Sequence, residues 1–371
     1  MSKLPFRYDI VGSFLRPAVL LKAREDFRNG KIDEQKLQVI EREEIKKLVD
    51  KEAKAGLKAV TDGEFTRSWF AEDWIVGLNG MEKLQLEHGI KFHSVETTGE
   101  YHTVAGKIGY NPDHPFFALF EFLKSVTPEG HIPKVTIPAP ALIFNYNPFA
   151  FTPDVYKGNK EEYLNDLVDA YKKSISRFYD LGCRYLQLDD TMWTYFAYFL
   201  KNARTDLEKS TILQVAKDDL YILNKILEGK PSDLWISMHS CRGNYKSDYA
   251  FEGAYDSIID TLSKVNVDGL FLEYDDERSG GFEPLAKIHA ESPTRRVILG
   301  LITSKFAKLE SEDEVIARIH EAAKYIPLEN LGLSTQCGFA SCEEGNILTE
   351  EEQWAKVDLV IRIAKRVWGD A

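Results

Sequence analysis

The sequence predicts a (β/α)8 barrel, and three observations lead to this fold class. Short β-branched or aliphatic runs that end in a polar residue alternate with longer segments of helical periodicity. Apolar runs such as Leu-Trp-Ile-Ser-Met and Gly-Leu-Phe-Leu are typical of strands buried on both faces, as in parallel sheets. The length of 371 residues suits one barrel with insertions, as well as two or three smaller domains. An open doubly wound sheet is the alternative, but no glycine-rich phosphate loop follows any predicted strand.

Eight short runs predict the strands of the barrel. In chain order they cover residues 8–13, 57–64, 134–138, 184–190, 234–241, 268–273, 296–302 and 331–337. Seven segments with apolar residues at helical spacing predict helices over residues 33–55, 161–181, 206–227, 255–265, 283–290, 312–325 and 350–367. The first of these helices places Leu37, Ile45 and Leu48 on one side and ends at Gly56, and the second ends at Gly182.

Residues 65–132 do not fit this alternation. They hold Trp69, Phe70 and Trp74, followed by a Gly/Thr-rich stretch and an apolar run. We interpret the whole chain, residues 1–371, as a single barrel in which 65–132 is an insertion in a βα loop with its own hairpin, and 138–153 as a second insertion. Long insertions at the carboxyl ends of barrel strands usually cover the active site. A satellite core or an oligomer contact is the alternative for the aromatic side chains in them.

Charge and composition exclude several classes of protein. The net charge is −12 and no run of five basic residues occurs, which argues against binding of nucleic acid or an anionic membrane. No stretch of 18 apolar residues or signal-peptide pattern is present, and four cysteines do not make a disulfide framework. We therefore expect a soluble cytoplasmic protein with reduced thiols.

Polar residues at the carboxyl ends of the predicted strands are the candidate functional residues, because these ends converge on one face of a barrel. They are Ser13, Glu64, Asp189, Asp190, His239, Cys241, Glu273 and Cys337. Thiolate, imidazole and carboxylate are the ligands that Zn²⁺ accepts. His239 and Cys241 are two residues apart, so on a strand both point to the same side. We prefer Cys337 to Cys342 as a ligand because Cys337 ends an apolar run, whereas Cys342 falls in the polar loop that follows.

Six short motifs that contain these residues resemble the C-terminal catalytic barrel of cobalamin-independent methionine synthase, in the same order. They are Asp9-Ile-Val-Gly-Ser-Phe-Leu-Arg-Pro17, Thr61-Asp-Gly-Glu64, Leu186-Gln-Leu-Asp-Asp190, Met238-His-Ser-Cys241, Phe271-Leu-Glu273 with Arg278-Ser279, and Gln336-Cys-Gly338. The resemblance spans nearly the whole chain, so a short, single-barrel homologue is expected.

The resemblance implies a zinc site made of four residues, His239, Cys241, Glu273 and Cys337. It also implies a homocysteine pocket in which Ser13 and the backbone around Val11 and Gly12 hold the carboxylate, while Glu64 and Asp189 hold the ammonium group. The expected reaction is methyl transfer from a small-molecule donor to the homocysteine thiol, giving methionine. Zinc would keep the thiol deprotonated, and Glu273 is the ligand that we expect to yield to substrate. Glu273 and Asp189 are thus the candidate catalytic residues.

Three positions depart from the family where its members contact folate. Pro140 and Tyr195 stand where the family has a tryptophan and a glutamate, and Thr303 stands where it has a proton-donating histidine. The methyl donor, the physiological thiol and the oligomeric state, including a homo-oligomer, are therefore left open. The alternatives are a thiol methyltransferase with a non-folate donor and a different thiol, a zinc hydrolase or decarboxylase with Asp190 as its base, and a non-enzymatic zinc or amino-acid binding module.

Overall fold

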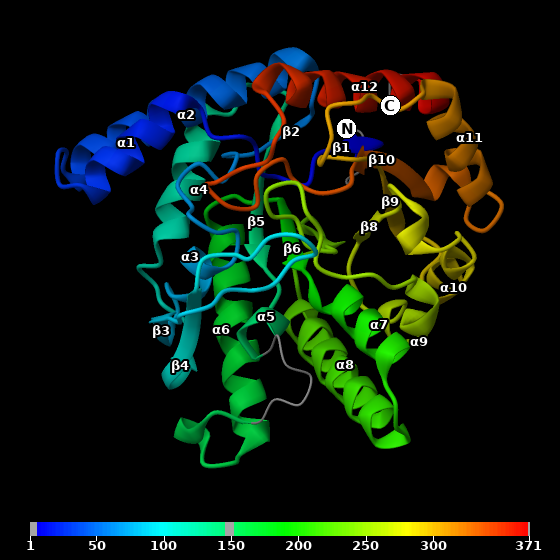
Figure 1. The fold of residues 1–371 in the computed structure, drawn as a ribbon, viewed down its shortest axis with the longest axis horizontal. Helices are drawn as coiled ribbons and strands as arrows, with labels where there is room; N and C mark the ends of the chain where they lie inside the picture. The colour runs from blue at the N-terminus through cyan, green and yellow to red at the C-terminus, as the bar shows by residue number, and fades with distance from the viewer. Residues whose placement is uncertain (1–5, 145–151, 370–371) are drawn as a thin grey trace.

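Eight parallel strands form one sheet in the computed structural model of the chain, which describes residues 6–144 and 152–369. The strands are β1 (Tyr8–Asp9), β2 (Ala59–Val60), β5 (Ile132–Pro138), β6 (Tyr185–Asp190), β7 (Trp235–Ser240), β8 (Gly269–Glu273), β9 (Arg296–Ile302) and β10 (Leu331–Thr335). Their order in the sheet is β1-β10-β9-β8-β7-β6-β5-β2. Figure 1 shows the sheet curled into a nearly closed barrel with helices around it. The predicted α/β barrel is confirmed: seven strands lie inside their predicted runs, and β5 begins two residues before its run, 134–138.

The barrel is completed by the loops that follow its two edge strands, β1 and β2. Both strands are only two residues long, although the sequence predicted longer ones. Beyond them, the Phe14 amide donates to the Gly63 carbonyl at 3.1 Å and the Thr61 hydroxyl donates to the Gly12 carbonyl at 2.8 Å. A Cβ atom at Gly12 would lie 2.8 Å from Cγ2 of Thr136, so this close approach requires glycine.

Most of the predicted helices are present on the outside of the barrel. They are α2 (Glu34–Ala55), α6 (Lys160–Asp180), α8 (Asp206–Leu227), α10 (Pro284–Glu291), α11 (Glu312–Ala322) and α12 (Glu350–Trp368). Their ends follow from local chemistry. The Asp33 side chain accepts from the Lys36 amide at the start of α2, and Gly56 ends the helix with φ at 101°.

One helix prediction was wrong in extent. Residues 255–265 form the short turn η2 (Tyr255–Ser257) and the four-residue helix α9 (Ile259–Leu262), because Ile258, with φ at −121°, interrupts the helical backbone. Other elements were not predicted: α1 (Ala18–Arg28), α3 (Glu72–Ile75), α4 (Pro115–Val126), α5 (Ala141–Phe144), α7 (Met192–Asn202), η1 (Asp154–Tyr156), η3 (Glu277–Ser279) and η4 (Leu328–Asn330). In α7 the first six residues are all buried, so this part of the helix has no exposed face that polar residues could mark.

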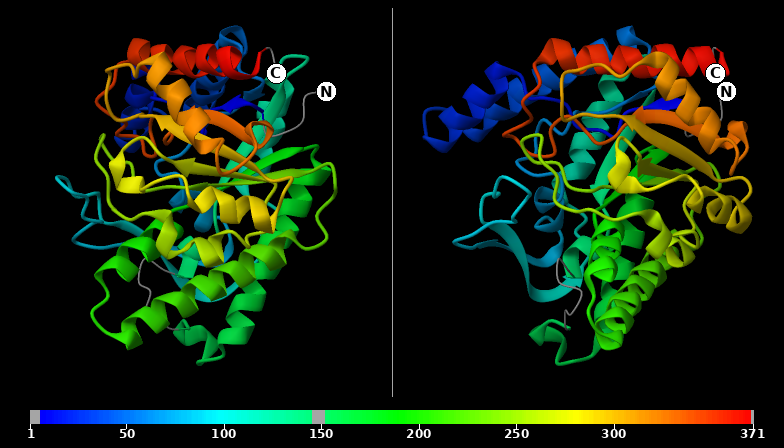
Figure 2. Two further views of the ribbon diagram at one scale, coloured as in Figure 1. Left: turned by 90° about the vertical axis from the view of Figure 1, so that its right-hand side faces the viewer. Right: turned by 45° about the vertical axis from the view of Figure 1, so that its right-hand side comes forward.

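The segment between β2 and β5 contains an antiparallel hairpin, β3 (Asn79–Gln85) paired with β4 (Glu100–Gly109). Figure 2 shows this hairpin standing out beside the barrel. Its turn reaches the loop after β7, where the Ser94 hydroxyl donates to Asp248 at 2.8 Å and the His93 amide donates to the Tyr249 carbonyl. Of the segment 138–153, residues 145–151 lie outside the described residues.

Polar side chains of β6 cross the interior of the barrel. Alternate residues of a strand point the same way, so Tyr185, Gln187 and Asp189 lie on one face of β6. Two of them bond to the segment around β1, which is not next to β6 in the sheet. The Tyr185 hydroxyl donates to Asp9 at 2.6 Å, and Gln187 Nε2 donates to the Val11 carbonyl at 2.7 Å. This column leads from the interior to Asp189, at the carboxyl end of β6.

Among the described residues, no helix is long and apolar enough to cross a membrane.

Candidate metal centre

Four side chains from three strand ends form a compact group of potential metal ligands. His239, Cys241, Glu273 and Cys337 each offer one ligand atom, these atoms lie within 4.8 Å of one another, and all four residues are buried. Cys241 Sγ lies 3.7 Å from Cys337 Sγ, and His239 Nε2 lies 3.2 Å from Glu273 Oε1. The parallel strands β7, β8 and β10 present their carboxyl ends at one side of the barrel, which brings the four residues together. The group could hold a metal ion.

The two other cysteines lie outside this group. The Cys342 backbone bridges to Trp69, and burial raises the pKa of the Cys342 thiol. The Cys183 thiol contacts the Tyr185 carbonyl oxygen at 3.4 Å, and burial raises its pKa to about 12. Neither of these two sulfurs belongs to the group of four ligand atoms. The structure thus places Cys337, not Cys342, with His239 and Cys241.

Two of the four candidate ligands, Glu273 and Cys337, have pKa values below their usual ones. Burial raises the pKa of Glu273, but hydrogen bonding to His239 and the charge of Lys305 outweigh it, so the pKa lies below its usual value. The hydrogen bond from Cys241 lowers the pKa of Cys337, against the effect of burial, whereas the pKa of Cys241 is raised well above normal by the same contact and by burial.

Gln336 and Lys305 support Glu273, and sequence reasoning missed both. Gln336 Nε2 donates to Glu273 Oε2 at 2.7 Å. Its Oε1 accepts from Lys305 Nζ at 3.0 Å and from the Ser304 hydroxyl at 3.3 Å. Because two donors face Oε1, the amide orientation of Gln336 is determined. Lys305 follows the carboxyl end of β9 and is only 2 % exposed, so the strand-end criterion could have found it if it had been applied to this strand.

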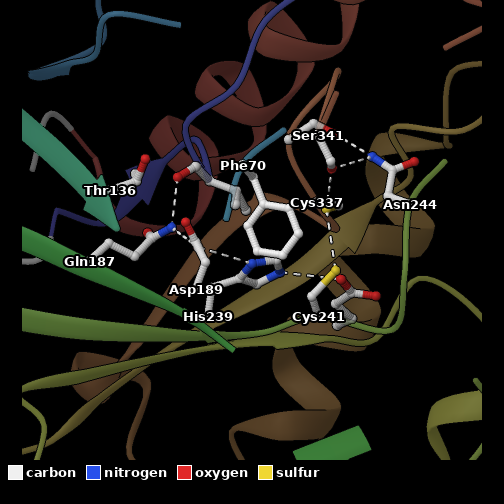
Figure 3. A network of polar contacts seen from close by, with 12 residues as sticks. Phe70, Thr136, Gln187, Asp189, His239, Cys241, Asn244, Cys337 and Ser341 are labelled. Atoms are coloured by element: carbon white, nitrogen blue, oxygen red, sulfur yellow. Dashed lines mark hydrogen bonds and ion pairs between the residues drawn. The ribbon is translucent and has the colours of Figure 1, made fainter. Parts of the chain in front are cut away.

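Figure 3 shows the polar contacts that flank the sulfur atoms and the imidazole. On one side, Gln187 Nε2 donates to Asp189 Oδ1 at 2.7 Å, and the same oxygen lies 3.4 Å from His239 Nδ1. On the other side, Cys337 Sγ lies 3.8 Å from the Ser341 hydroxyl oxygen, which lies 3.5 Å from Asn244 Nδ2. Hydrogen-bonding side chains therefore flank the ligand group on both sides, and the ring of Phe70 lies beside the His239 imidazole (Figure 3).

Glu64 is a buried carboxylate with unused hydrogen-bonding capacity. Its Oε1 accepts from the Thr136 hydroxyl at 3.1 Å and lies 3.5 Å from Arg67 Nη1, whereas Oε2 is buried without a hydrogen-bond partner among the described residues. Burial raises the pKa of Glu64 to about 7, in spite of Arg67 nearby. Its backbone has φ at 61°, a conformation that non-glycine residues adopt rarely and mostly at functional positions.

The other predicted pocket residues lie on the loop after β1. The Ser13 hydroxyl oxygen accepts from the Ala340 amide at 3.2 Å, and the Ser13 carbonyl accepts from the Phe339 amide at 2.9 Å. The carbonyls of Val11 and Gly12 accept from Gln187 and Thr61. These bonds tie the loop after β1 to the loops after β2 and β10, so it lies next to Cys337 in the fold.

The remaining candidates lie apart from the ligand group. Asp190 points the other way on β6, accepts from the Met192 amide at 2.6 Å, and has its pKa raised to about 7 by burial. Tyr195 lies in α7, and the centroid of its ring is 4.4 Å from that of Phe199 and 5.0 Å from that of Phe251. Thr303 donates its amide to Glu310 at 2.9 Å, and Pro140 is buried.

Comparison with known proteins shows which family the chain is similar to. Residues 151–365 match the family described as cobalamin-independent synthase, catalytic domain. The uncharacterized protein YxjG of Bacillus subtilis is 44 % identical over 99 % of this chain and 96 % of its own length. A crystal structure from Listeria monocytogenes, named a "Putative Vitamin-B12 Independent Methionine Synthase", is 36 % identical, has a TM-score of 0.76 and covers 99 % of both chains.

A more distant structure shares the fold. The B12-independent methionine synthase of Shewanella sp. W3-18-1 is 18 % identical with a TM-score of 0.72, over 97 % of each chain. The family match covers more than half of this chain, and the similarity to YxjG extends over nearly all of it. The chain therefore belongs to the cobalamin-independent methionine synthase catalytic-domain family.

Proposed function

We propose that this protein is a zinc-dependent methyltransferase that transfers a methyl group to a thiol, with homocysteine as the acceptor and methionine as the product. The observation that carries the proposal is the buried group of His239, Cys241, Glu273 and Cys337, whose ligand atoms lie within 4.8 Å of one another. Family membership and the resemblance of the site motifs to methionine synthase support the same reaction.

The ligand group fits zinc in its chemistry. Two sulfurs, one imidazole nitrogen and one carboxylate oxygen are a set that Zn²⁺ accepts, and the pKa values of Glu273 and Cys337 are shifted toward the anionic forms that bind a metal. When bound here, zinc would supply Lewis acidity that keeps a substrate thiol deprotonated at neutral pH while leaving its sulfur nucleophilic. A free thiol with a pKa near 8.5 is mostly protonated at that pH.

Within this proposal the protein's own residues bind and orient the amino acid. Oε2 of Glu64 has no hydrogen-bond partner among the described residues, which suits it to accept a hydrogen bond from the substrate ammonium group. Asp189 is the second carboxylate that we assign to the ammonium group. Ser13, in the loop held against residues 338–340, would contact the substrate carboxylate. Gln336 donates to Oε2 of Glu273 and accepts from Lys305. The two residues therefore restrain Glu273, the ligand that we expect to yield to substrate.

The alternative of a zinc hydrolase or decarboxylase is not favoured by the placement of Asp190. That carboxyl group is fully buried and its Oδ1 accepts from the first amide of α7, so it serves the helix rather than the ligand group. A methyltransferase with a non-folate donor and another thiol is the second alternative. Tyr195, which stands where the family has a folate-contacting glutamate, packs against the rings of Phe199 and Phe251.

A methyl-transfer assay tests the proposal. Zinc-loaded protein is incubated with homocysteine and, separately, a methylated folate, a methylated corrinoid and a methyl sulfonium compound, and methionine is quantified. We expect methionine from at least one donor, loss of activity after chelation, and recovery on adding zinc. The variant Cys342→Ser should behave like the wild type, whereas Cys337→Ser should be inactive. Equal turnover by the chelated and zinc-loaded proteins would refute zinc-dependent chemistry.

A further inference from the structure

The two ring nitrogens of His239 face different carboxylates. Nε2 lies 3.2 Å from Glu273 Oε1, on the side of the other three ligand atoms, whereas Nδ1 lies 3.4 Å from Asp189 Oδ1. A neutral imidazole carries its proton on one nitrogen and can bind a metal only through the other. The nitrogen toward the ligand group is Nε2, so the proton of a metal-binding His239 belongs on Nδ1, facing Asp189.

Asp189 is itself held in place. Gln187 Nε2 donates to Asp189 Oδ1 at 2.7 Å and also donates to the Val11 carbonyl at 2.7 Å, so it links β6 to the loop after β1. Asp189 is 6 % exposed, and its backbone carbonyl accepts from the Ala139 amide at 2.8 Å. The carboxylate therefore has little freedom to move away from the imidazole.

We propose that Asp189 is a positioning residue for the metal centre: it accepts the Nδ1 proton of His239, fixes the tautomer and orientation of the ring, and leaves Nε2 free for the metal. This inference rests on the proposed zinc site and adds a second role to a carboxylate that we otherwise assign to the substrate ammonium group. Among the described residues, the contacts of the Asp189 side chain with Gln187 and His239 both use Oδ1, which leaves Oδ2 for substrate. Partners of this kind typically change metal affinity by 10- to 100-fold.

Glu64 provides a matched control because it is the other carboxylate assigned to the ammonium group. Its side-chain partners are Thr136 and Arg67, and no contact joins it to His239 within the part of the chain that the structure describes. Burial raises the pKa of Glu64 to about 7, so at pH 8 most Glu64 side chains carry a negative charge. A general attraction of zinc by nearby negative charge would then affect Glu64→Gln and Asp189→Asn alike.

The test is zinc affinity without substrate, measured at pH 8 by competition with a chromophoric chelator. We expect about tenfold weaker binding for Asp189→Asn, which keeps the shape and an acceptor, up to about 100-fold weaker binding for Asp189→Ala, and wild-type affinity for Glu64→Gln. The melting temperature of the metal-free proteins reports on folding, and Asp189→Asn should match the wild type there. Long-range ¹H–¹⁵N spectra of the zinc-loaded wild type should show the His239 proton on Nδ1.

Each result has a definite meaning. Wild-type zinc affinity in both Asp189 variants, or equal losses in Asp189→Asn and Glu64→Gln, would overturn the positioning role but leave the proposed function intact. A His239 proton found on Nε2 in the zinc-loaded protein would overturn it as well. A wild type that binds no zinc would instead refute the proposed function, and with it this inference.

Discussion

The substitution Glu64→Gln should separate recognition of the amino group from the chemistry at the thiol. Oε2 of Glu64 is buried without a partner among the described residues, so a substrate ammonium group would supply its missing hydrogen bond. A hydrogen bond to a charged group is worth about 1.5–3 kcal/mol, which corresponds to about 10- to 150-fold in affinity. Arg67, at 3.5 Å from Oε1, already neutralises part of the charge, which favours the lower half of that range.

Homocysteine binding should also depend on pH through the same group. Burial raises the pKa of Glu64 to about 7, and only the ionised carboxylate accepts from an ammonium group while keeping a complementary charge. Below pH 7 the carboxyl group is increasingly protonated, so the affinity for homocysteine, relative to that for a thiol without the amino group, should fall by up to about tenfold for each pH unit and should level off above pH 8. Glu64→Gln should abolish this dependence.

Calorimetric titration of the zinc-loaded protein measures both effects. The comparison ligand is 4-mercaptobutyrate, which keeps the thiol and carboxylate of homocysteine but lacks the amino group, so Glu64→Gln should leave its affinity unchanged. Glu41→Gln is the matched control, because burial also raises the pKa of Glu41 to about 7 but its partner is Arg24. Equal losses for homocysteine and 4-mercaptobutyrate in Glu64→Gln, with normal zinc content, would refute the assignment of Glu64 to the ammonium group.

Three further outcomes follow from the structure. Metal analysis should find about one zinc ion per chain in the wild type and in Cys342→Ser but little in Cys337→Ser, and the reverse pattern would overturn the ligand set. Methyltetrahydrofolate should be a weak donor or none, because Pro140 and Tyr195 replace the folate-contacting residues of the family at a cost of about 1–3 kcal/mol for each unpaired polar group, and efficient turnover at micromolar concentration would contradict this. Trp74→Ala should lower the free energy of unfolding by about 3–5 kcal/mol in denaturant titrations, because the ring is fully buried against His114, Phe116 and Phe178. A loss below about 1 kcal/mol would show that these contacts contribute little.

The barrel and its ligand residues could be predicted from the sequence because both depend on local patterns. A strand buried on both faces reads as a short apolar run, and a strand overlaps each of the eight runs. In a parallel barrel the polar residue that ends such a run lies at one shared face, whatever the distance along the chain. That rule is sufficient to bring His239, Cys241, Glu273 and Cys337 together, although Glu273 and Cys337 are 64 residues apart.

Elements buried on all sides were decided by tertiary packing. The first six residues of α7 are all buried, Thr194 among them, so no alternation of buried apolar and exposed polar residues marks this part of the chain as a helix. The edge strands β1 and β2 are shorter than their apolar runs because the loops that follow them turn toward each other, and hydrogen bonds between Phe14 and Gly63 and between Thr61 and Gly12 join them.

Which side chain supports which ligand was also decided only in three dimensions. The sequence by itself determined the fold class and the residue types at the strand ends, because periodicity and strand-end position are properties of neighbouring residues. It could not determine that Gln336 holds Glu273, that Lys305 holds Gln336, or that Asp189 faces Nδ1 of His239. These contacts join different strands, and their geometry depends on how the barrel curls and on which rotamer each side chain adopts, which no local pattern in the chain specifies.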